Sequence, residues 1–286
     1  MKTERVRWEH WDAVRCATAE AELIIGVSAG PRCLSLRYRG GNNLLHLDTT
    51  DFRVGDWRLY GGHRFTVAPE GPQSYVPDNA PCEVRREEHV LIITAPTYSS
   101  GLRRNLRVTP IEDGAGFSLD HVLENQGRNP WTGALWAITC VPSSGPVVAR
   151  RGPGNPRFWP GTDVTPWDIG PDVLTVVANG TRGKAGWHSD PAWLASLQSD
   201  AAFVIHSPQA PGREDCVDDG CNVEVFTDTN YVELETLSGQ INLPPGGTTQ
   251  HLQRWRVLAP IYSAADWRAL GADAGCTQAA SALHEP

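Results

Sequence analysis

The chain has 286 residues, a formal net charge of −8 and 40% hydrophobic residues. The charge is spread without a basic stripe, which argues against nucleic acid or an anionic membrane surface as a partner. No apolar run approaches the ~20 residues that a membrane span needs, and the charged N-terminus lacks the apolar segment of a secretory signal. The seven cysteines are scattered without a CxxC pair, which indicates free thiols and neither a metal site nor a cofactor. We therefore expect a cytoplasmic protein, monomeric or homodimeric.

In chain order, residues 1–20 are predicted to form an N-terminal extension, and strands begin at Ala21. Residues 33–38 alternate between apolar and polar side chains, as a half-buried strand does. Glycine and proline turns separate the runs that follow. Many short strands at roughly 8–12-residue spacing are typical of an all-β sandwich or barrel. The further predicted strands cover residues 82–84, 90–94, 102–108, 117–123, 133–139, 174–177, 201–206, 223–227, 231–236 and 251–257.

The domain organisation follows from these runs. Residues 143–171 are rich in Gly and Pro and are interpreted as a long excursion over one face of the sheet, although a domain boundary could lie there. We expect one domain over residues 1–286, with a β-sandwich over 21–258. A short helix at 264–270 and a tail complete the segment 259–286.

The first chemical motif is the segment Gly-Gly-His-Arg-Phe-Thr-Val-Ala-Pro-Glu at residues 61–70. Its two glycines allow a turn that brings side chains into a cleft. Adjacent strand residues point to opposite faces, so His63 and Arg64 cannot both face a ligand in a regular strand. We expect Arg64 to face it. Alternatively, Arg64 pairs with Glu70 and braces the loop, or Glu70 serves as an acid.

The second motif places Glu224, Glu233 and Glu235 on β-rich runs. A strand interior is unfavourable for Glu unless the side chain reaches water or is used. Glu233 and Glu235 share a strand face, and neighbouring carboxylates raise a pKa, which suits a base near neutral pH. Alternatively, these are solvated residues of the outer face. The chain has eleven tryptophans, a residue that is favoured where a flat apolar face is needed, as in a sugar-binding cleft. The motifs together predict a polar cleft on a large β-sandwich for a neutral polyhydroxylated ligand.

The order of these segments resembles the galactose mutarotase-like superfamily, which contains the aldose 1-epimerases, and within it a bacterial branch with a GGHR…PE signature. The resemblance covers residues 21–258. Residues 62–65 stand where epimerases carry an Asn-Arg pair, and residues 120–125 are similar to the family's His-x-x-x-Asn strand. Residues 234–236 resemble the segment with the catalytic carboxylate, and residues 244–248 resemble the closing turn. The resemblance implies an all-β galactose mutarotase-like supersandwich.

By this resemblance, Glu235 is the base of sugar ring opening, His121 is the acid, and Arg64 binds and orients hydroxyls, with His63 as a further catalytic candidate. His121 shares a strand face with apolar neighbours, so a core histidine is the alternative. The family's second histidine is missing from residues 72–79, where Tyr75 or Asp78 could replace it.

Residues 184–188 also resemble a signature of the same branch. Lys184 would bind a carboxylate or sulfate on an acidic sugar, and Trp187 would stack on a pyranose face; the alternative is a turn with a surface lysine and a packed tryptophan. The expected substrate contacts are Arg64, Glu70, Lys184, Trp187, Glu233 and Glu224.

Three hypotheses for function follow from these segments. The first is an aldose 1-epimerase-like isomerase acting on a monosaccharide or sugar derivative. The second is a lyase or hydrolase acting on a modified or acidic saccharide, using Glu235 with His63 or His121. The third is a carbohydrate-binding protein without catalysis.

Overall fold

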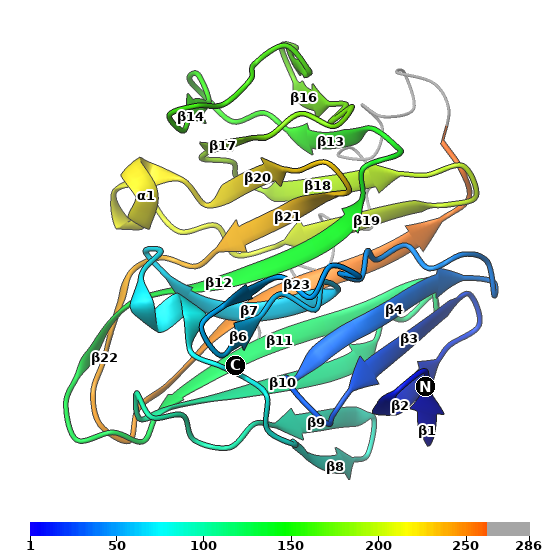
Figure 1. Cartoon of the computed structure of the whole chain (residues 1–286), viewed down its shortest axis with the longest axis vertical. Coiled ribbons are helices and arrows are strands. Elements are labelled where there is room, and N and C mark those ends of the chain that lie inside the picture. The colour runs from blue at the N-terminus through cyan, green and yellow to red at the C-terminus, as the bar shows by residue number, and fades with distance from the viewer. Residues whose placement is uncertain (262–286) are drawn as a thin grey trace.

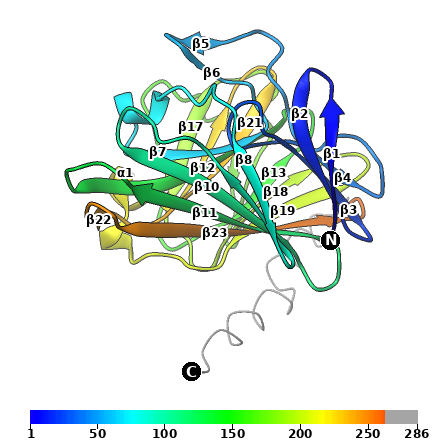
Figure 2. The ribbon, with the colours of Figure 1, turned by 90° about the horizontal axis from the view of Figure 1, so that it is seen from below.

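The computed structural model describes residues 1–261, in which two large antiparallel sheets pack face to face (Figures 1 and 2). The prediction of an all-β sandwich is therefore confirmed. One sheet has eleven strands. In spatial order they are β1 (Lys2–Trp8), β2 (Trp11–Ala17), β3 (Ala21–Gly26), β4 (Arg32–Tyr38), β7 (His63–Ala68), β12 (Trp131–Pro142), β21 (Tyr231–Leu237), β20 (Val223–Thr227), β17 (Gly183–Trp187) and β14 (Arg157–Phe158), with β22 (Ile241–Leu243) beside β12.

The other sheet has ten strands and covers one face of the first (Figure 2). In spatial order they are β15 (Trp167–Ile169), β16 (Val173–Val176), β13 (Val147–Arg150), β18 (Ala192–Leu197), β19 (Ala202–Ser207), β23 (Thr248–Leu258), β11 (Gly116–Asn125), β10 (Leu102–Pro110), β9 (Val90–Thr94) and β8 (Glu83–Glu87).

Helical structure is sparse among the described residues. It consists of two 3₁₀ turns, η1 (Pro72–Tyr75) and η2 (Arg213–Asp215), and the single turn α1 (Val217–Gly220). None of these helices is long or apolar enough to cross a membrane. A two-stranded hairpin, β5 (Arg53–Val54) with β6 (Trp57–Arg58), projects from the eleven-stranded sheet on the side away from β11 and β23 (Figure 2).

The sheet begins earlier in the chain than predicted. Strands β1 and β2 pair along their whole length, and β2 pairs with β3, so residues 1–20 continue the sheet. Trp11 and Val14 on β2 are buried. Charged residues hid this pattern, because β1 is an edge strand that buries none of its side chains fully.

Residues 143–171 also differ from the prediction of a long excursion, because they contribute three short strands, β13, β14 and β15, to the two sheets. Gly and Pro separate strands here and do not mark one loop. The predicted helix at 264–270 and the tail lie outside the described residues.

The main hydrophobic core fills the space between the sheets, with Leu23 and Val225 from one sheet and Phe117, Phe203 and Trp255 from the other. Burial of each such side chain contributes roughly 1.5–3 kcal/mol. Because strand residues alternate in direction, every second residue of β7, β12 and β21 must point away from this core. These outward residues form the floor of the site described next.

Candidate active site

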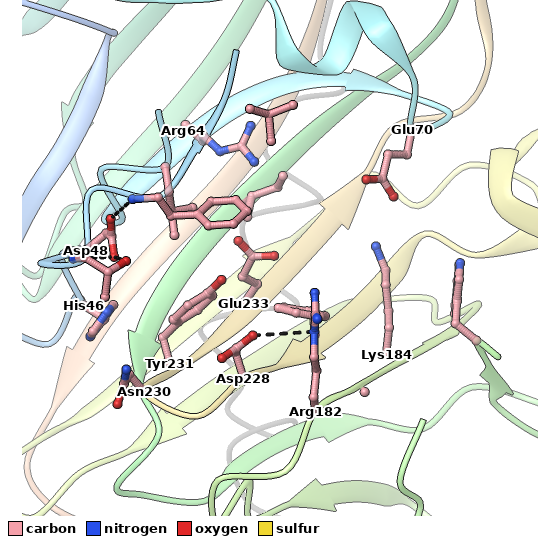
Figure 3. Close-up of a pocket in the computed structure, with 18 of the residues that line it drawn as sticks. His46, Asp48, Arg64, Glu70, Arg182, Lys184, Asp228, Asn230, Tyr231 and Glu233 are labelled. Atoms are coloured by element: carbon pink, nitrogen blue, oxygen red, sulfur yellow. Dashed lines mark hydrogen bonds and ion pairs between the residues drawn. The ribbon is translucent and has the colours of Figure 1, made fainter. Parts of the chain in front are cut away.

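A cavity of about 970 Å³ lies on the outer face of the eleven-stranded sheet (Figure 3). This volume lies near the upper end of the range for small-molecule sites, roughly 300–1,000 Å³. Its lining contains seven acidic or basic side chains: Asp48, Arg64, Glu70, Arg182, Lys184, Asp228 and Glu233. Aromatic rings line it as well: Trp57, Trp136, Trp159, Phe226, Tyr75 and Tyr231. Flat apolar rings combined with hydrogen-bonding groups suit the faces and hydroxyls of a sugar.

Strand register decides which residues reach this cavity. Ile138 of β12 lies between Arg64 of β7 and Glu235 of β21, and Cys140 lies opposite Glu233. These residues therefore share the outer face, while His63, next to Arg64, points into the core between the sheets. The expectation that Arg64 faces the cleft agrees with this geometry.

Glu233 lies at the centre of the cavity, with Cys140 Sγ 3.6 Å from its Oε1 (Figure 3). Burial and then the negative charge of Glu235 raise the pKa of Glu233 to about 7, against the attraction of Arg64 and Lys184. A carboxylate that is half ionised near neutral pH can both accept and return a proton.

Glu235 has a different environment, although it shares the strand face. Its side chain is fully buried and does not line the cavity. The Glu235 Oε2 atom accepts hydrogen bonds from Trp136 Nε1 at 2.7 Å and from Lys184 Nζ at 3.0 Å. The role of Glu235 as the base stays a prediction, because Trp136 and Lys184 occupy its Oε2 atom while its Oε1 atom is buried without a hydrogen-bond partner.

Lys184 is held between two carboxylates. Its Nζ lies 2.6 Å from Glu224 Oε2, and it also lies 4.6 Å from the centre of the Trp136 ring. Burial alone lowers the pKa of Lys184, but the charges of Glu235 and Glu224 outweigh burial and raise it. Burial also raises the pKa of Glu224 well above its usual value, against the attraction of Lys184.

Glu224 and Trp187 do not reach the cavity. Glu224 is fully buried beside Glu235, and Trp187 packs in the main core while its Nε1 donates a hydrogen bond to the Arg150 carbonyl at 2.8 Å. Their expected roles as substrate contacts are corrected accordingly. Trp187 is the packed tryptophan of the alternative interpretation.

His63 and His121 lie in the core, on the opposite face of the sheet from the cavity. His121 Nδ1 donates to the His251 carbonyl at 2.8 Å, so its Nε2 is free to accept a hydrogen bond from His63 Nε2, 2.7 Å away. His63 Nδ1 then accepts from the Thr139 hydroxyl at 2.8 Å. Burial lowers the pKa of His121 to about 4 and that of His63 well below its usual value.

The histidine pair is thus a neutral, fully hydrogen-bonded element of the core. Neither ring reaches the cavity, so the expectation that His63 and His121 are catalytic is corrected. The core-histidine alternative describes His121 correctly, because it shares its face with buried Leu119 and Leu123.

Glu70 and Tyr75 line the cavity together, with the Tyr75 hydroxyl donating a hydrogen bond to Glu70. Burial, followed by this hydrogen bond, raises the pKa of Tyr75 to about 12. Asp78, the other suggested substitute for the missing histidine, instead forms a buried ion pair with Arg32 at 2.8 Å. No ion pair joins Arg64 to Glu70 among the described residues.

Several lining residues were missed by the sequence interpretation. Tyr231 continues the outward alternation of Glu233 and Glu235, so the period of two could have identified it. His46 stacks on the Tyr231 ring with 5.3 Å between ring centres. No local pattern marks His46, because backbone hydrogen bonds to Gly62 and Cys140 place its loop beside the cavity.

No family model matches the chain, and no curated protein matches its sequence. Solved structures do match in fold. A galactose mutarotase-like protein from Lactobacillus casei has a TM-score of 0.59 at 11% identity and covers 86% of this chain and 99% of its own. One from Clostridium acetobutylicum has a TM-score of 0.60 at 11% identity, covering 90% and 98%.

A protein from Escherichia coli that is provisionally assigned as an aldose 1-epimerase has a TM-score of 0.60 at 11% identity, covering 86% of this chain and 98% of its own. At such identity the likeness concerns architecture. The chain thus has the galactose mutarotase-like β-sandwich fold.

Proposed function

We propose that this protein is an aldose 1-epimerase-like isomerase that interconverts the anomers of a sugar, with Glu233 as its base. The observation that carries the proposal is a carboxylate with a pKa of about 7 in the centre of a cavity lined by aromatic rings and hydrogen-bonding groups. A general base works best when its pKa is near the operating pH. The fold shared with mutarotase-like proteins supports the same reaction class.

The reaction needs one proton acceptor and one proton donor. Glu233 takes the proton of the anomeric hydroxyl, the bond between the anomeric carbon and the ring oxygen breaks, and its electron pair goes to the ring oxygen. A donor protonates that oxygen; Tyr75 and Tyr231 line the cavity and are the phenols available for this step. Rotation about the first carbon–carbon bond, followed by the reverse steps, gives the other anomer and returns both protons.

The lyase or hydrolase hypothesis required Glu235 together with His63 or His121. These three side chains are buried away from the cavity, so no observation favours that combination. A binding protein without catalysis would use the same rings and charges but would not need Glu233 to ionise.

The test is NMR measurement of anomer exchange on a panel of aldoses and uronic acids. We expect acceleration by the wild type and a loss of about 10²–10⁴-fold in kcat/KM for Glu233→Gln, the usual size of a general-base contribution. Glu83→Gln, an exposed glutamate on β8, is the matched control and should retain full activity. Absence of acceleration on every sugar would reject the isomerase and leave the binding protein.

A further inference from the structure

The cavity contains three basic side chains, and two of them already have acidic partners. Lys184 Nζ lies 2.6 Å from Glu224 and 3.0 Å from Glu235, and Arg182 Nε lies 3.6 Å from Asp228. Arg64 is the exception. Among residues 1–261, no carboxylate lies within ion-pair distance of its guanidinium and no hydrogen bond to it is formed.

Arg64 is also strongly desolvated. Only 8% of the residue is exposed, and its Nε is buried without a partner. Burial lowers the pKa of Arg64 against the attraction of Glu233. The Trp57 ring, 4.7 Å from the guanidinium carbon, offsets part of this cost through a cation–π contact. A buried charge is normally paired with an opposite charge. Arg64 has no such partner among the described residues, so a negatively charged group of a ligand can serve as its counterion.

We propose that Arg64 binds the carboxylate of the substrate, which is therefore an acidic aldose of the hexuronate class. The planar guanidinium fork matches a carboxylate in a bidentate geometry that a hydroxyl cannot reproduce. This substrate class rests on the proposed function for its chemistry at the anomeric carbon, whereas the carboxylate contact itself does not depend on turnover.

The charge balance favours a carboxylate over a phosphate. Because Lys184 and Arg182 are already paired, Arg64 is the basic side chain of the cavity that has no carboxylate within ion-pair distance among residues 1–261. A carboxylate carries one negative charge and neutralises it. A phosphate dianion would leave a surplus negative charge in a cavity that also contains Glu70 and Glu233.

The positions of Arg64 and Glu233 are consistent with one pyranose ring. Figure 3 shows both side chains facing the same space, and they do not form an ion pair. In a hexuronate ring, the carbon that bears the carboxylate and the anomeric carbon flank the same ring oxygen. A carboxylate held by Arg64 therefore directs the anomeric end of the ring towards the remaining cavity groups, where Glu233 is the base.

Calorimetric titration tests the inference without requiring catalysis. The probes are galacturonate and glucuronate, their neutral counterparts galactose and glucose, and glucose 6-phosphate. We expect uronates to bind at least tenfold more tightly than the neutral sugars. Arg64→Met should weaken uronate binding by about 10- to 100-fold, the range of a charge-assisted hydrogen-bonded pair, and should change neutral-sugar binding less than threefold.

Two further variants serve as controls for the effect of Arg64→Met. Arg64→Lys keeps the charge and loses the fork, so it should weaken uronate binding by about three- to tenfold even if Arg64→Met folds poorly. Arg85→Met, on the exposed strand β8, should bind all probes as the wild type does. Equal affinity for galactose and galacturonate, equal losses for both in Arg64→Met, or tighter binding of glucose 6-phosphate would each overturn the inference.

The outcome is separable from that of the proposed function. Uronate binding that depends on Arg64, without anomer exchange, would support the carboxylate site and reject the isomerase. Anomer exchange on neutral aldoses alone would support the isomerase and reject the carboxylate site.

Discussion

The two faces of β7, β12 and β21 treat polar residues in opposite ways. On the inner face, His63 of β7 is hydrogen bonded to His121 of β11 in the other sheet, and both ring nitrogens of each histidine have a partner. On the outer face, Arg64 has no hydrogen-bond or ion-pair partner among residues 1–261, and Glu233, which lines the same cavity, is contacted by the Cys140 thiol at 3.6 Å. Residues adjacent in sequence thus serve stability on one face and ligand chemistry on the other. Polar satisfaction, more than residue type, distinguishes them.

The carboxylates on the outer face differ in burial: Glu224 and Glu235 are buried, whereas Glu233 lines the cavity. The buried residues Glu235 and Glu224 both pair with Lys184, and Trp136 donates a hydrogen bond to Glu235. Glu233, two residues before Glu235 on the same strand, has no ion-pair partner among the described residues and is contacted by the Cys140 thiol. Burial of Glu233, and then the negative charge of the neighbouring Glu235, raise the pKa of Glu233.

The largest effect on stability is expected in the buried cluster of Lys184, Glu224 and Glu235. Lys184→Met leaves two buried carboxyl groups without a cation and should lower the free energy of unfolding by about 3–5 kcal/mol, as measured by urea denaturation. Adding Glu235→Gln removes one carboxylate and should recover part of the loss. A loss below about 1 kcal/mol for Lys184→Met would show that this lysine is not a structural counterion.

The inner face should respond in stability alone. His121→Leu removes the acceptor of His63 and should cost about 2–3 kcal/mol, because a buried donor loses its partner. Its kcat/KM, measured where the variant is folded, should stay within about threefold of the wild type, in contrast to Glu233→Gln. A large catalytic loss with unchanged stability would restore a catalytic role for His121.

A smaller effect concerns the pH dependence of stability. The pKa of Glu233 rises from 4.5 to about 7 on folding, so its stability contribution is fully present below pH 4.5 and is lost as pH rises through 7. Glu233→Gln cannot ionise and should gain about 2 kcal/mol relative to the wild type between pH 5 and pH 8. Parallel stability curves for the two proteins would contradict the raised pKa.

The architecture could be predicted from the sequence because it depends on local signals. Period-two runs and turn residues identified most strands, and alternation placed His63 and Arg64 on opposite faces. The edge strand β1 was missed for the same reason, since an exposed strand buries too few residues to leave an apolar pattern.

The site was only partly predictable. The period-two alternation placed Glu233 and Glu235 on the same strand face. It could not show which of the two carboxylates would pair with a basic side chain from a neighbouring strand. That depended on Lys184, about fifty positions away in the sequence, which lies against Glu235 only because β17, β20 and β21 pair side by side.

The fold class and the candidate segments could be inferred without the structure, because the strand period is a property of neighbouring residues. Tertiary structure decided which face the second sheet covers, which carboxylate remains open, and which arginine lacks a partner. Burial and charge pairing depend on contacts between distant segments, and these contacts set both the pKa of Glu233 and the unpaired charge of Arg64.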